Sequence, residues 1–360
     1  MKNELEFKVK FSGYCGTSFI NCFTSTYIFL EKINSRHKDG DSCEKSQCDD
    51  CGSCGKDEGY FFLFDTMCGH SSLRCRFDGE LTMMDKMIND ENFYDGGSDN
   101  NVDFLFGFAG YEYRKLTDAA KFKDEIMASV EAGKPVIAKI KAGDDPFRVL
   151  IGYDDDALIC PDFSMAQQKP EIAPTYDELD TLYIIGNKTD PLYTLLDGLK
   201  RIRKVMEYNI NEHLWDSYKE KMGLYTSDSL RNCSIEEKKA RMKRTADTMW
   251  HTFNCHNFAQ VFRKYLGNDN PSSYDAISDM KRLRNPEFQD LFGKISGPCY
   301  GYTHDLAWAL IGLEACADWT QHAVGYFGEL VELTISQIAK NDEEVLDAIR
   351  RVVTILEESK

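Results

Sequence analysis

The sequence predicts an α+β protein of two parts, because its two halves carry different apolar periodicities. Three β-rich runs separated by Asp/Gly turns lie in the first half, at residues 136–140, 147–153 and 157–160. Four long stretches of helical periodicity fill the second half, at residues 194–222, 234–266, 304–340 and 342–358. We therefore expect a mixed domain at residues 1–190 and a mainly α-helical domain at residues 191–360 that packs onto it, with the boundary between Thr189 and Leu192.

Four further features complete the expected first domain. An apolar stripe predicts a helix over residues 16–33, and residues 118–132 predict an amphipathic helix that ends at Gly133. Residues 60–64 and 73–77 have the composition of short strands, or of a strand and a turn. Residues 36–59 are polar, rich in Asp, Lys, Gly and Cys, and have no apolar face, so we expect an inserted loop.

Length, charge and cysteine content limit the possible functions. At 360 residues, 42% of them hydrophobic, the chain can bury two cores without disulfide support. The net charge of -17 repels phosphate backbones and anionic lipids, which argues against nucleic acid or a membrane as partner. The N-terminus lacks a signal-peptide stretch, and no run approaches the roughly 20 apolar residues of a membrane helix. We therefore expect a cytoplasmic protein. In that reducing compartment, its 13 cysteines are expected to be buried residues, nucleophiles or metal ligands rather than disulfides.

Cys15 is the first candidate for chemistry, because it stands at the N-terminal end of the helix expected at residues 16–33. The exposed N–H groups of a helix N-terminus lower the pKa of a thiol and offer donors to an oxyanion. A papain-type nucleophile has this setting. The alternative interpretation is that Cys15 is one more small buried residue of a cysteine-rich chain.

Several segments around Cys15 and downstream resemble a known family. SGYCGTSF opens the first helix, and GKPVIAKI, FRVLIGYDDD and ICPDF follow in this order. The series resembles the papain-like fold of bacteriocin-leader-cleaving cysteine peptidases and, more closely, of the butirosin biosynthesis protein H family. ACADWTQHAVGYFGELVEL and LDAIRRVVTILEESK are similar to the helical domain of that family. The resemblance implies that Cys15 is the nucleophile and Asp162 the acidic member of a catalytic triad.

The histidine of the family pattern has no counterpart here. Its place, at the start of the strand that leads into the Gly-Tyr-Asp turn, falls on Pro146 or on its neighbours Asp145 and Phe147. The glutamine that usually precedes the cysteine is also absent. Because a positioned base contributes roughly 100- to 10,000-fold in rate, two hypotheses remain. Either His70, in TMCGHSSL, acts as the base, or the fold has lost catalysis and binds a partner; His70 can also be an ordinary turn residue.

Four cysteines within twelve residues predict a metal site in the 36–59 loop. Cys43, Cys48, Cys51 and Cys54 have the spacing C-x4-C-x2-C-x2-C. Thiolates at this density favour zinc or an iron–sulfur cluster. Four cysteine ligands would close the coordination shell, so we expect a structural centre. The alternative is an exposed loop whose thiols bind nothing.

Two other groups are weaker candidates. His251, Cys255 and His256 fall on an aromatic-rich helical segment, where core packing is the more common role, although the first two have a chelating i, i+4 spacing. The acidic turns at residues 49–50 and 154–156 are interpreted as solvated charge, since they lack calcium-loop spacing.

These observations favour thiol-dependent acyl transfer through an acyl-cysteine intermediate, on a small-molecule or peptide substrate. The family resemblance implies an amine acceptor and an acyl-carrier-protein thioester as donor, in specialised metabolite biosynthesis. The acidic chain favours a cationic acceptor such as an aminoglycoside. A catalytically degenerate binding or assembly protein on the same fold is the rival interpretation, and a cysteine peptidase is the third.

Overall fold

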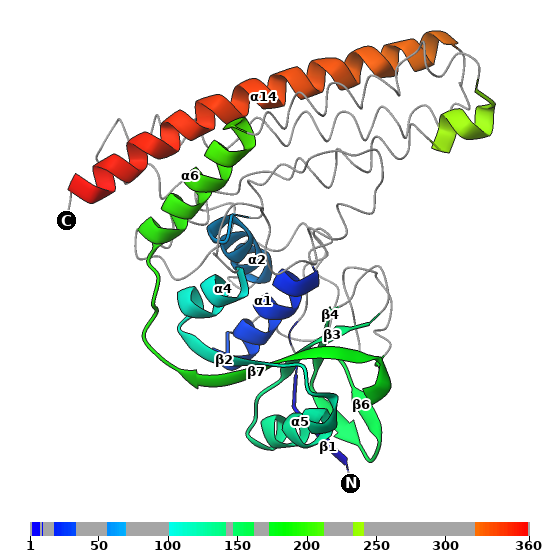
Figure 1. The fold of residues 1–360 in the computed structure, drawn as a ribbon, viewed down its shortest axis with the longest axis vertical. Coiled ribbons are helices and arrows are strands. Elements are labelled where there is room, and N and C mark those ends of the chain that lie inside the picture. The colour runs from blue at the N-terminus through cyan, green and yellow to red at the C-terminus, as the bar shows by residue number, and fades with distance from the viewer. Residues whose placement is uncertain are drawn as a thin grey trace, which may run out of the picture.

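The computed structural model describes residues 2–7, 9, 18–33, 56–69, 101–141, 147–161, 173–211, 233–240 and 321–358 (Figure 1). Within these residues the chain is mixed α+β, with two antiparallel sheets and several helices. The expected α+β class is therefore confirmed. No helix in this part of the chain is long and apolar enough to span a membrane.

A four-stranded antiparallel sheet forms the centre of the first half. Its strands, in spatial order, are β2 (Tyr111–Leu116), β7 (Leu179–Lys188), β3 (Val136–Ile140) and β4 (Phe147–Leu150). The ten-residue strand β7 pairs with both β2 and β3, so it holds the sheet together. The sheet is covered by α1 (Ser18–Leu30) on one face and by α5 (Phe122–Glu131) on the other (Figure 1).

Side chains alternate between the two faces, as the two-residue period of a strand requires. The residues that join the α1-side core are Ile137, Phe147, Val149, Tyr183 and Ile185. Their neighbours in the core on the α5 side are Val136, Ala138, Leu150 and Leu182. Because both faces of the sheet are buried, the sequences of these strands are nearly continuous apolar runs.

A second, three-stranded sheet extends from the end of β4. Its order is β1 (Lys2–Glu4), β5 (Gly152–Asp154) and β6 (Ala157–Ile159), all antiparallel. Only Ile151 separates β4 from β5, and its N–H donates to the carbonyl of Ile159 at 2.8 Å. A Cβ atom at Gly152 would lie 2.5 Å from the carbonyl oxygen of Asn3, so β1 can pair here only with glycine at that position.

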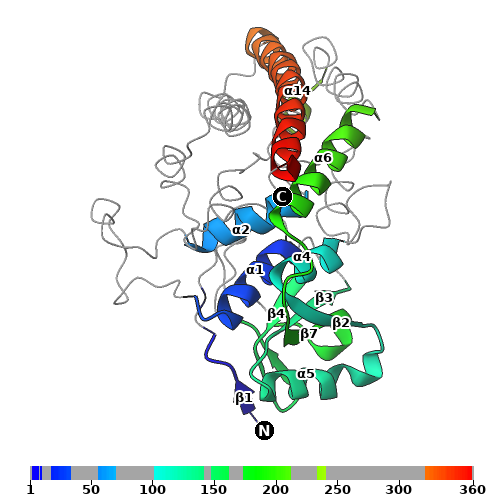
Figure 2. The same ribbon diagram turned by 90° about the vertical axis from the view of Figure 1, so that its left-hand side faces the viewer.

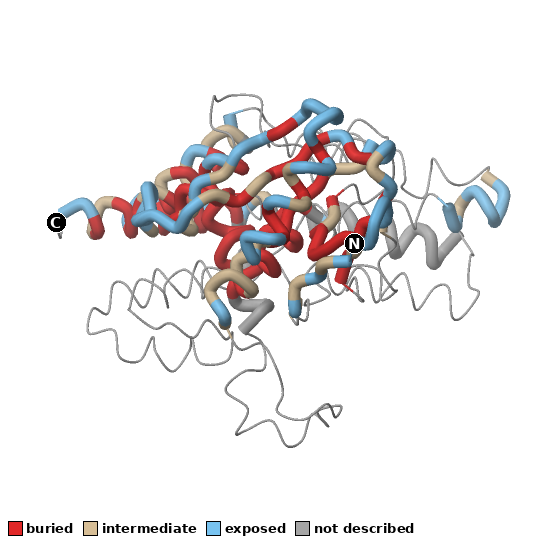
Figure 3. The backbone as a smooth tube through the Cα atoms, turned by 90° about the horizontal axis from the view of Figure 1, so that it is seen from below, coloured by how far each residue is buried: buried red, intermediate tan, exposed pale blue. Residues whose placement is uncertain are grey.

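Four further helices lie on the α1 side of the sheet (Figures 1 and 2). They are α2 (Lys56–Met67), α4 (Asn101–Ala109), α6 (Leu195–Asn211) and α14 (Gln321–Glu358). A capping box begins α6, because the Asp197 carboxylate accepts from the Thr194 N–H at 2.7 Å and the Thr194 hydroxyl accepts from the Asp197 N–H at 3.3 Å. Buried and exposed positions alternate along the C-terminal end of α14 (Figure 3), as expected for a helix with one face on the core.

Several expected elements are confirmed. The β-rich runs form β3, β4, β5 and β6, and the run at residues 147–153 is shared between the two sheets. The first helix is present as α1. The amphipathic helix at residues 118–132 is present as a short 3-10 turn followed by α5, and Gly133 ends it with a φ of 78°.

Three expectations, about residues 60–64, the polar loop and the last helix, are wrong. Residues 60–64 are helical rather than extended, because they belong to α2, where buried Tyr60, Phe64 and Met67 recur at helical spacing. The polar loop does not extend to residue 59, since α2 already begins at Lys56. The break expected near residue 341 is absent, because α14 continues through Asn341 without a Gly or Pro to end it. Residues 73–77 lie outside the described part.

Candidate functional site at the N-terminal end of α1

All predicted site residues lie outside the residues that the structure describes. They are the catalytic candidates Cys15, His70 and Asp162 and the metal candidates Cys43, Cys48, Cys51 and Cys54, and the same holds for Pro146 and for His251, Cys255 and His256. The described residues that flank the catalytic candidates are Ser18 at the start of α1, Gly69 after α2, Phe147 at the start of β4 and Pro161 after β6. The positions of these flanking residues therefore define the surroundings of the candidate site.

The helix that follows Cys15 is buried on all sides. Every residue from Phe19 to Thr26 is buried, so α1 runs through the interior rather than over the surface. It contacts β3 and β4 of the sheet below and α2 beside it. A helix enclosed in this way has a fixed position, which is what a nucleophile at its end would require.

The start of α1 packs against the start of β4. The ring centroid of Phe19 lies 5.2 Å from that of Phe147 and 5.3 Å from that of Tyr183, both in edge-to-face geometry. Cys15 precedes Ser18 by three residues in the sequence, and Pro146 directly precedes Phe147. The fold thus brings together the flanks of the two positions that the family pattern gives to the nucleophile and the base.

The strand position that faces α1 is occupied by an apolar ring. Phe147, one of the three positions where the family pattern expects histidine, is 1% exposed and contacts Phe19. A phenyl ring neither accepts nor releases a proton, so this position holds no base. Among the residues whose side chains the structure describes, none is a histidine.

The C-terminal end of α2, which leads into His70, points toward the N-terminal end of α1. The ring centroids of Tyr27 and Tyr60 are 5.4 Å apart and those of Phe23 and Phe64 are 5.0 Å apart, so the two helices run in opposite directions. Gly69 ends α2 with a φ of 87°, in the left-handed region that favours glycine. His70 is the next residue in the sequence.

The return strand β6 leads into Asp162. Cys160 and Pro161, the last described residues before it, are both buried, and Cys160 packs in the α5-side core with Leu150 and Tyr153. Cys160 therefore behaves as a small apolar residue. Cys22 and Cys68 are likewise buried, in the α1-side core, and the Cys68 thiol donates to the Asp65 carbonyl at 3.4 Å.

A polar cluster fixes the other end of α1. The Tyr111 hydroxyl donates to the Glu31 carboxylate at 2.6 Å, and the Lys188 ammonium donates to the same oxygen. Burial raises the pKa of the Tyr111 phenol above its usual value, and the hydrogen bond and charge of Glu31 raise it further. The phenol therefore stays protonated, and it joins α1 to β2 while Lys188 joins it to the end of β7.

The part of the chain that the structure describes offers no cluster of metal ligands. No group of three or more His, Cys, Asp or Glu side chains in the described ranges could hold an ion. Tyr183, which contacts Phe19, was missed by the sequence reasoning, because β7 was not among the expected strands. The apolar run at residues 182–185 was the available signal.

Comparisons with protein-family models, with curated proteins and with solved structures give no match for this chain. The described fold defines a class, an α+β chain in which a buried helix packs on an antiparallel sheet.

Proposed function

We propose that the chain is a thiol-dependent acyl-transfer enzyme on a papain-like plan, similar to the butirosin biosynthesis protein H family. The Cys15 thiolate attacks an amide or thioester carbonyl, and the amine or thiol of the substrate leaves with a proton. The acyl group, now a thioester on Cys15, passes to an amine or to water. The observation that carries the proposal is the packing of Phe19, at the start of α1, on Phe147 and Tyr183 of the sheet.

The architecture supports this proposal in two respects. A papain-like site needs a nucleophile at the start of a buried helix that packs on an antiparallel sheet, and α1 has this relation to β4 and β7. The hairpin of β5 and β6 then runs on toward Asp162. The resemblance assigns that residue to the orientation of the base.

His70 is the base in this proposal. The antiparallel packing of α1 and α2 supports the assignment, because it directs the end of α2 toward the end of α1 that follows Cys15. Imidazole suits the role, since its ordinary pKa of about 6.5 permits both acceptance and return of a proton near neutral pH.

An amine acceptor with a carrier-protein thioester as donor is the substrate pair that the family resemblance supports. The net charge of -17 favours a cationic acceptor, of which an aminoglycoside is one example. The same charge disfavours an acidic carrier protein as donor, so the acceptor is the better supported half of the pair.

A binding or assembly protein on the same fold is the second candidate function. The buried Phe147 ring favours it, because one of the expected histidine positions is filled by a side chain that only packs. A cysteine peptidase remains the third candidate. Reactivity of Cys15 distinguishes the first from the second.

The pH dependence of Cys15 alkylation tests the proposal. With iodoacetamide, we expect the rate at Cys15, followed by peptide mass spectrometry, to rise with a midpoint well below the roughly 8.5 of an ordinary thiol. The reason is that a helix N-terminus and a nearby imidazolium favour the thiolate. Cys22 and Cys68, both buried, should remain unmodified and so report that the chain stays folded. A midpoint at or above the ordinary value, or no reaction at Cys15 in the folded chain, contradicts the proposal.

We also propose that Cys43, Cys48, Cys51 and Cys54 bind one structural zinc ion or iron–sulfur cluster. The loop runs directly into α2, since Lys56 follows Cys54 by two residues, so a metal here would stabilise the start of a helix that packs on α1. About 20 polar residues without an apolar face have no other means to offset an ordering cost of roughly 1–2 kcal/mol per residue.

Elemental analysis tests the metal proposal. Protein purified without oxygen is expected to contain about one zinc per chain, or iron with sulfide, because four thiolates close a coordination shell. Cys48→Ser together with Cys51→Ser should remove the metal and lower thermal stability, whereas Cys233→Ser, outside the loop, should do neither. Metal-free protein whose four loop thiols all alkylate freely would exclude the site.

A further inference from the structure

The apolar core crosses the boundary expected between the two halves. The residues of α6 that are buried in the same core as α1, α2 and the sheet are Leu196, Leu199, Ile202, Val205 and Met206. From the far end of the chain, α14 adds Val345, Ile349, Val352 and Val353 to this core. Of the part of the chain after residue 190 that the structure describes, α6 and the C-terminal end of α14 therefore share a core with the first half.

The segment at the expected boundary is fixed to α4. The N–H of Leu192 donates to the carbonyl of Gly107 and the N–H of Thr189 donates to that of Gly110, both at 2.8 Å. The Tyr193 ring stacks on Phe104 with centroids 4.9 Å apart. A Cβ atom at Gly107 would lie 2.7 Å from the Tyr193 ring, so only glycine permits this approach. The segment is a packed connection and not a linker.

One buried cation joins α6 to two other helices. Arg201 is 7% exposed; its Nε donates to the Cys68 carbonyl at 2.8 Å and its Nη2 donates to Oδ1 of Asn101. Its guanidinium carbon lies 5.0 Å from the ring centroid of Phe104. Cys68 directly follows the last residue of α2, and Asn101 is the first residue of α4. Burial of a guanidinium costs free energy unless its N–H groups are hydrogen-bonded. The two hydrogen bonds therefore fix the end of α2 and the start of α4 relative to Arg201 on α6.

The end of α2 fits closely against α6 at the same place. A Cβ atom at Gly69 would lie 3.0 Å from Cγ2 of Val205. The positive Arg201 side chain also lies at the C-terminal end of α2, where the helix dipole favours a cation. The close packing of Gly69 on Val205 and the charge of Arg201 therefore favour the same position of α6 relative to α2.

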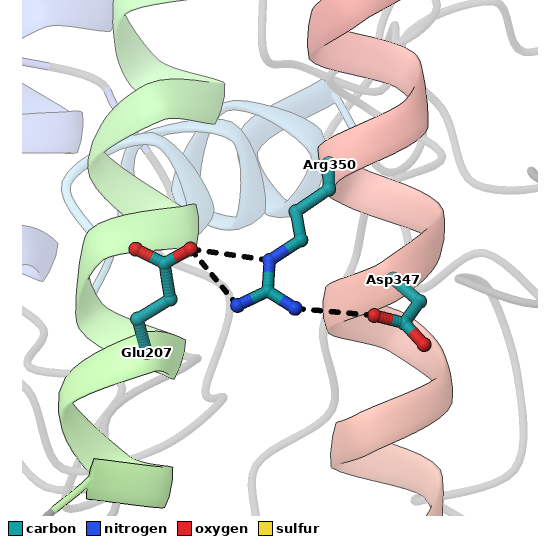
Figure 4. Close-up of polar contacts among 3 residues, drawn as sticks. All are labelled: Glu207, Asp347 and Arg350. Carbon is teal, nitrogen blue, oxygen red and sulfur yellow. Dashed lines mark hydrogen bonds and ion pairs between the residues drawn. The ribbon is translucent and has the colours of Figure 1, made fainter.

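The outer contacts between α6 and α14 are of a different kind (Figure 4). Nε and Nη2 of Arg350 each lie 3.1 Å from Oε1 of Glu207, and Nη1 lies 3.2 Å from Oδ1 of Asp347. These groups are exposed to solvent, where ion pairs contribute little. The buried apolar residues and Arg201, rather than this cluster, hold the helices to the core.

We propose that α6 and the C-terminal end of α14, residues 342–358, belong to the same cooperative folding unit as α1, α2, α4 and the four-stranded sheet. In this proposal the buried Arg201 stabilises the packing of α6 on α2 and α4. The folding unit is then discontinuous in sequence, and the division at residue 190 does not separate two autonomous domains. This proposal is independent of catalysis by Cys15.

Hydrogen exchange of the full chain, resolved by peptide, tests the proposal. In Arg201→Met, the slowest amides of α1, β7 and α6 are all expected to exchange faster by the same factor, at least about 30-fold, because two buried acceptors lose a charged donor. Lys200→Met is the matched control. It removes a cation from the neighbouring position of α6, where Lys200 forms an exposed ion pair with Glu357, and should change exchange by less than about 5-fold.

The pattern over the three elements decides the outcome. Acceleration confined to α6, with α1 and β7 unchanged, would show that α6 unfolds as a separate unit, and no acceleration would show that Arg201 does not stabilise the packing of α6 on α2 and α4. If Arg201→Met fails to fold, Arg201→Lys replaces it, since lysine keeps the charge and one donor. A smaller acceleration, equal in α1, β7 and α6, is then expected, and an unequal one overturns the proposal.

Discussion

Replacement of Phe64 by alanine is expected to lower the free energy of unfolding by about 3–5 kcal/mol, the usual cost of removing a fully buried ring. Phe64 is 2% exposed, and its ring centroid lies 5.0 Å from those of both Phe23 and Tyr27 in edge-to-face geometry. The substitution therefore removes the main contact between α2 and α1 and leaves a cavity at their interface. Urea denaturation followed by far-UV circular dichroism measures the change.

Two variants provide the comparison. Phe64→Leu keeps most of the volume and should cost about 1–2 kcal/mol. Leu333→Ala removes an apolar side chain that is 57% exposed on α14, and should change stability by no more than about 0.5 kcal/mol. A loss below about 1 kcal/mol in Phe64→Ala would mean that the aromatic contacts between α1 and α2 do not hold the fold.

Local pattern was sufficient where an element carries its own signals. The strand β3 is a short apolar run that begins after the turn at Gly133, and α5 has both a periodic apolar face and a glycine at its end. These features depend on residues that are close in the sequence. They could therefore be predicted without knowledge of what packs against them.

Elements whose character is set by distant contacts were missed. In α4, seven of the nine residues are buried, so the segment has no polar face to reveal a helical period. The aromatic run in α2 has strand-like composition but is helical, because its rings pack on those of α1. The central strand β7 obtains its neighbours from β2 and β3, far apart in the sequence.

The same contrast between local signals and distant contacts applies to the candidate site. The apolar stripe at residues 16–33 was sufficient to predict α1, whereas the place of Cys15 at its N-terminal end stays a prediction, since Cys15 lies outside the described residues. The contact of Phe19 with Phe147 could not be predicted, since it joins residues on separate elements. That contact explains why Phe147, one of the three positions where the family pattern has histidine, is apolar.

The other large effect concerns Cys15 itself. Cys15→Ser is expected to lower covalent acylation by a short acyl thioester about 1,000-fold or more, because the hydroxyl is a far weaker nucleophile than the thiolate without a tuned base. His70→Ala should lower the rate at Cys15 by roughly 100- to 10,000-fold if its imidazole is the base. His37→Ala, which removes another histidine of the first half, should leave the rate unchanged. Equal rates in the His70 and His37 variants would remove His70 from the mechanism while leaving the nucleophile in place.

Peptide mass spectrometry after incubation of the folded chain with an N-acetylcysteamine acyl thioester tests the central claim most directly. If Cys15 is the nucleophile, one acyl group appears on the Cys15 peptide, disappears on addition of an amine acceptor, and is absent in Cys15→Ser. An unmodified Cys15 in the folded chain, or acyl groups spread evenly over other cysteines such as the half-buried Cys233, would contradict acyl transfer and favour a binding protein on this fold.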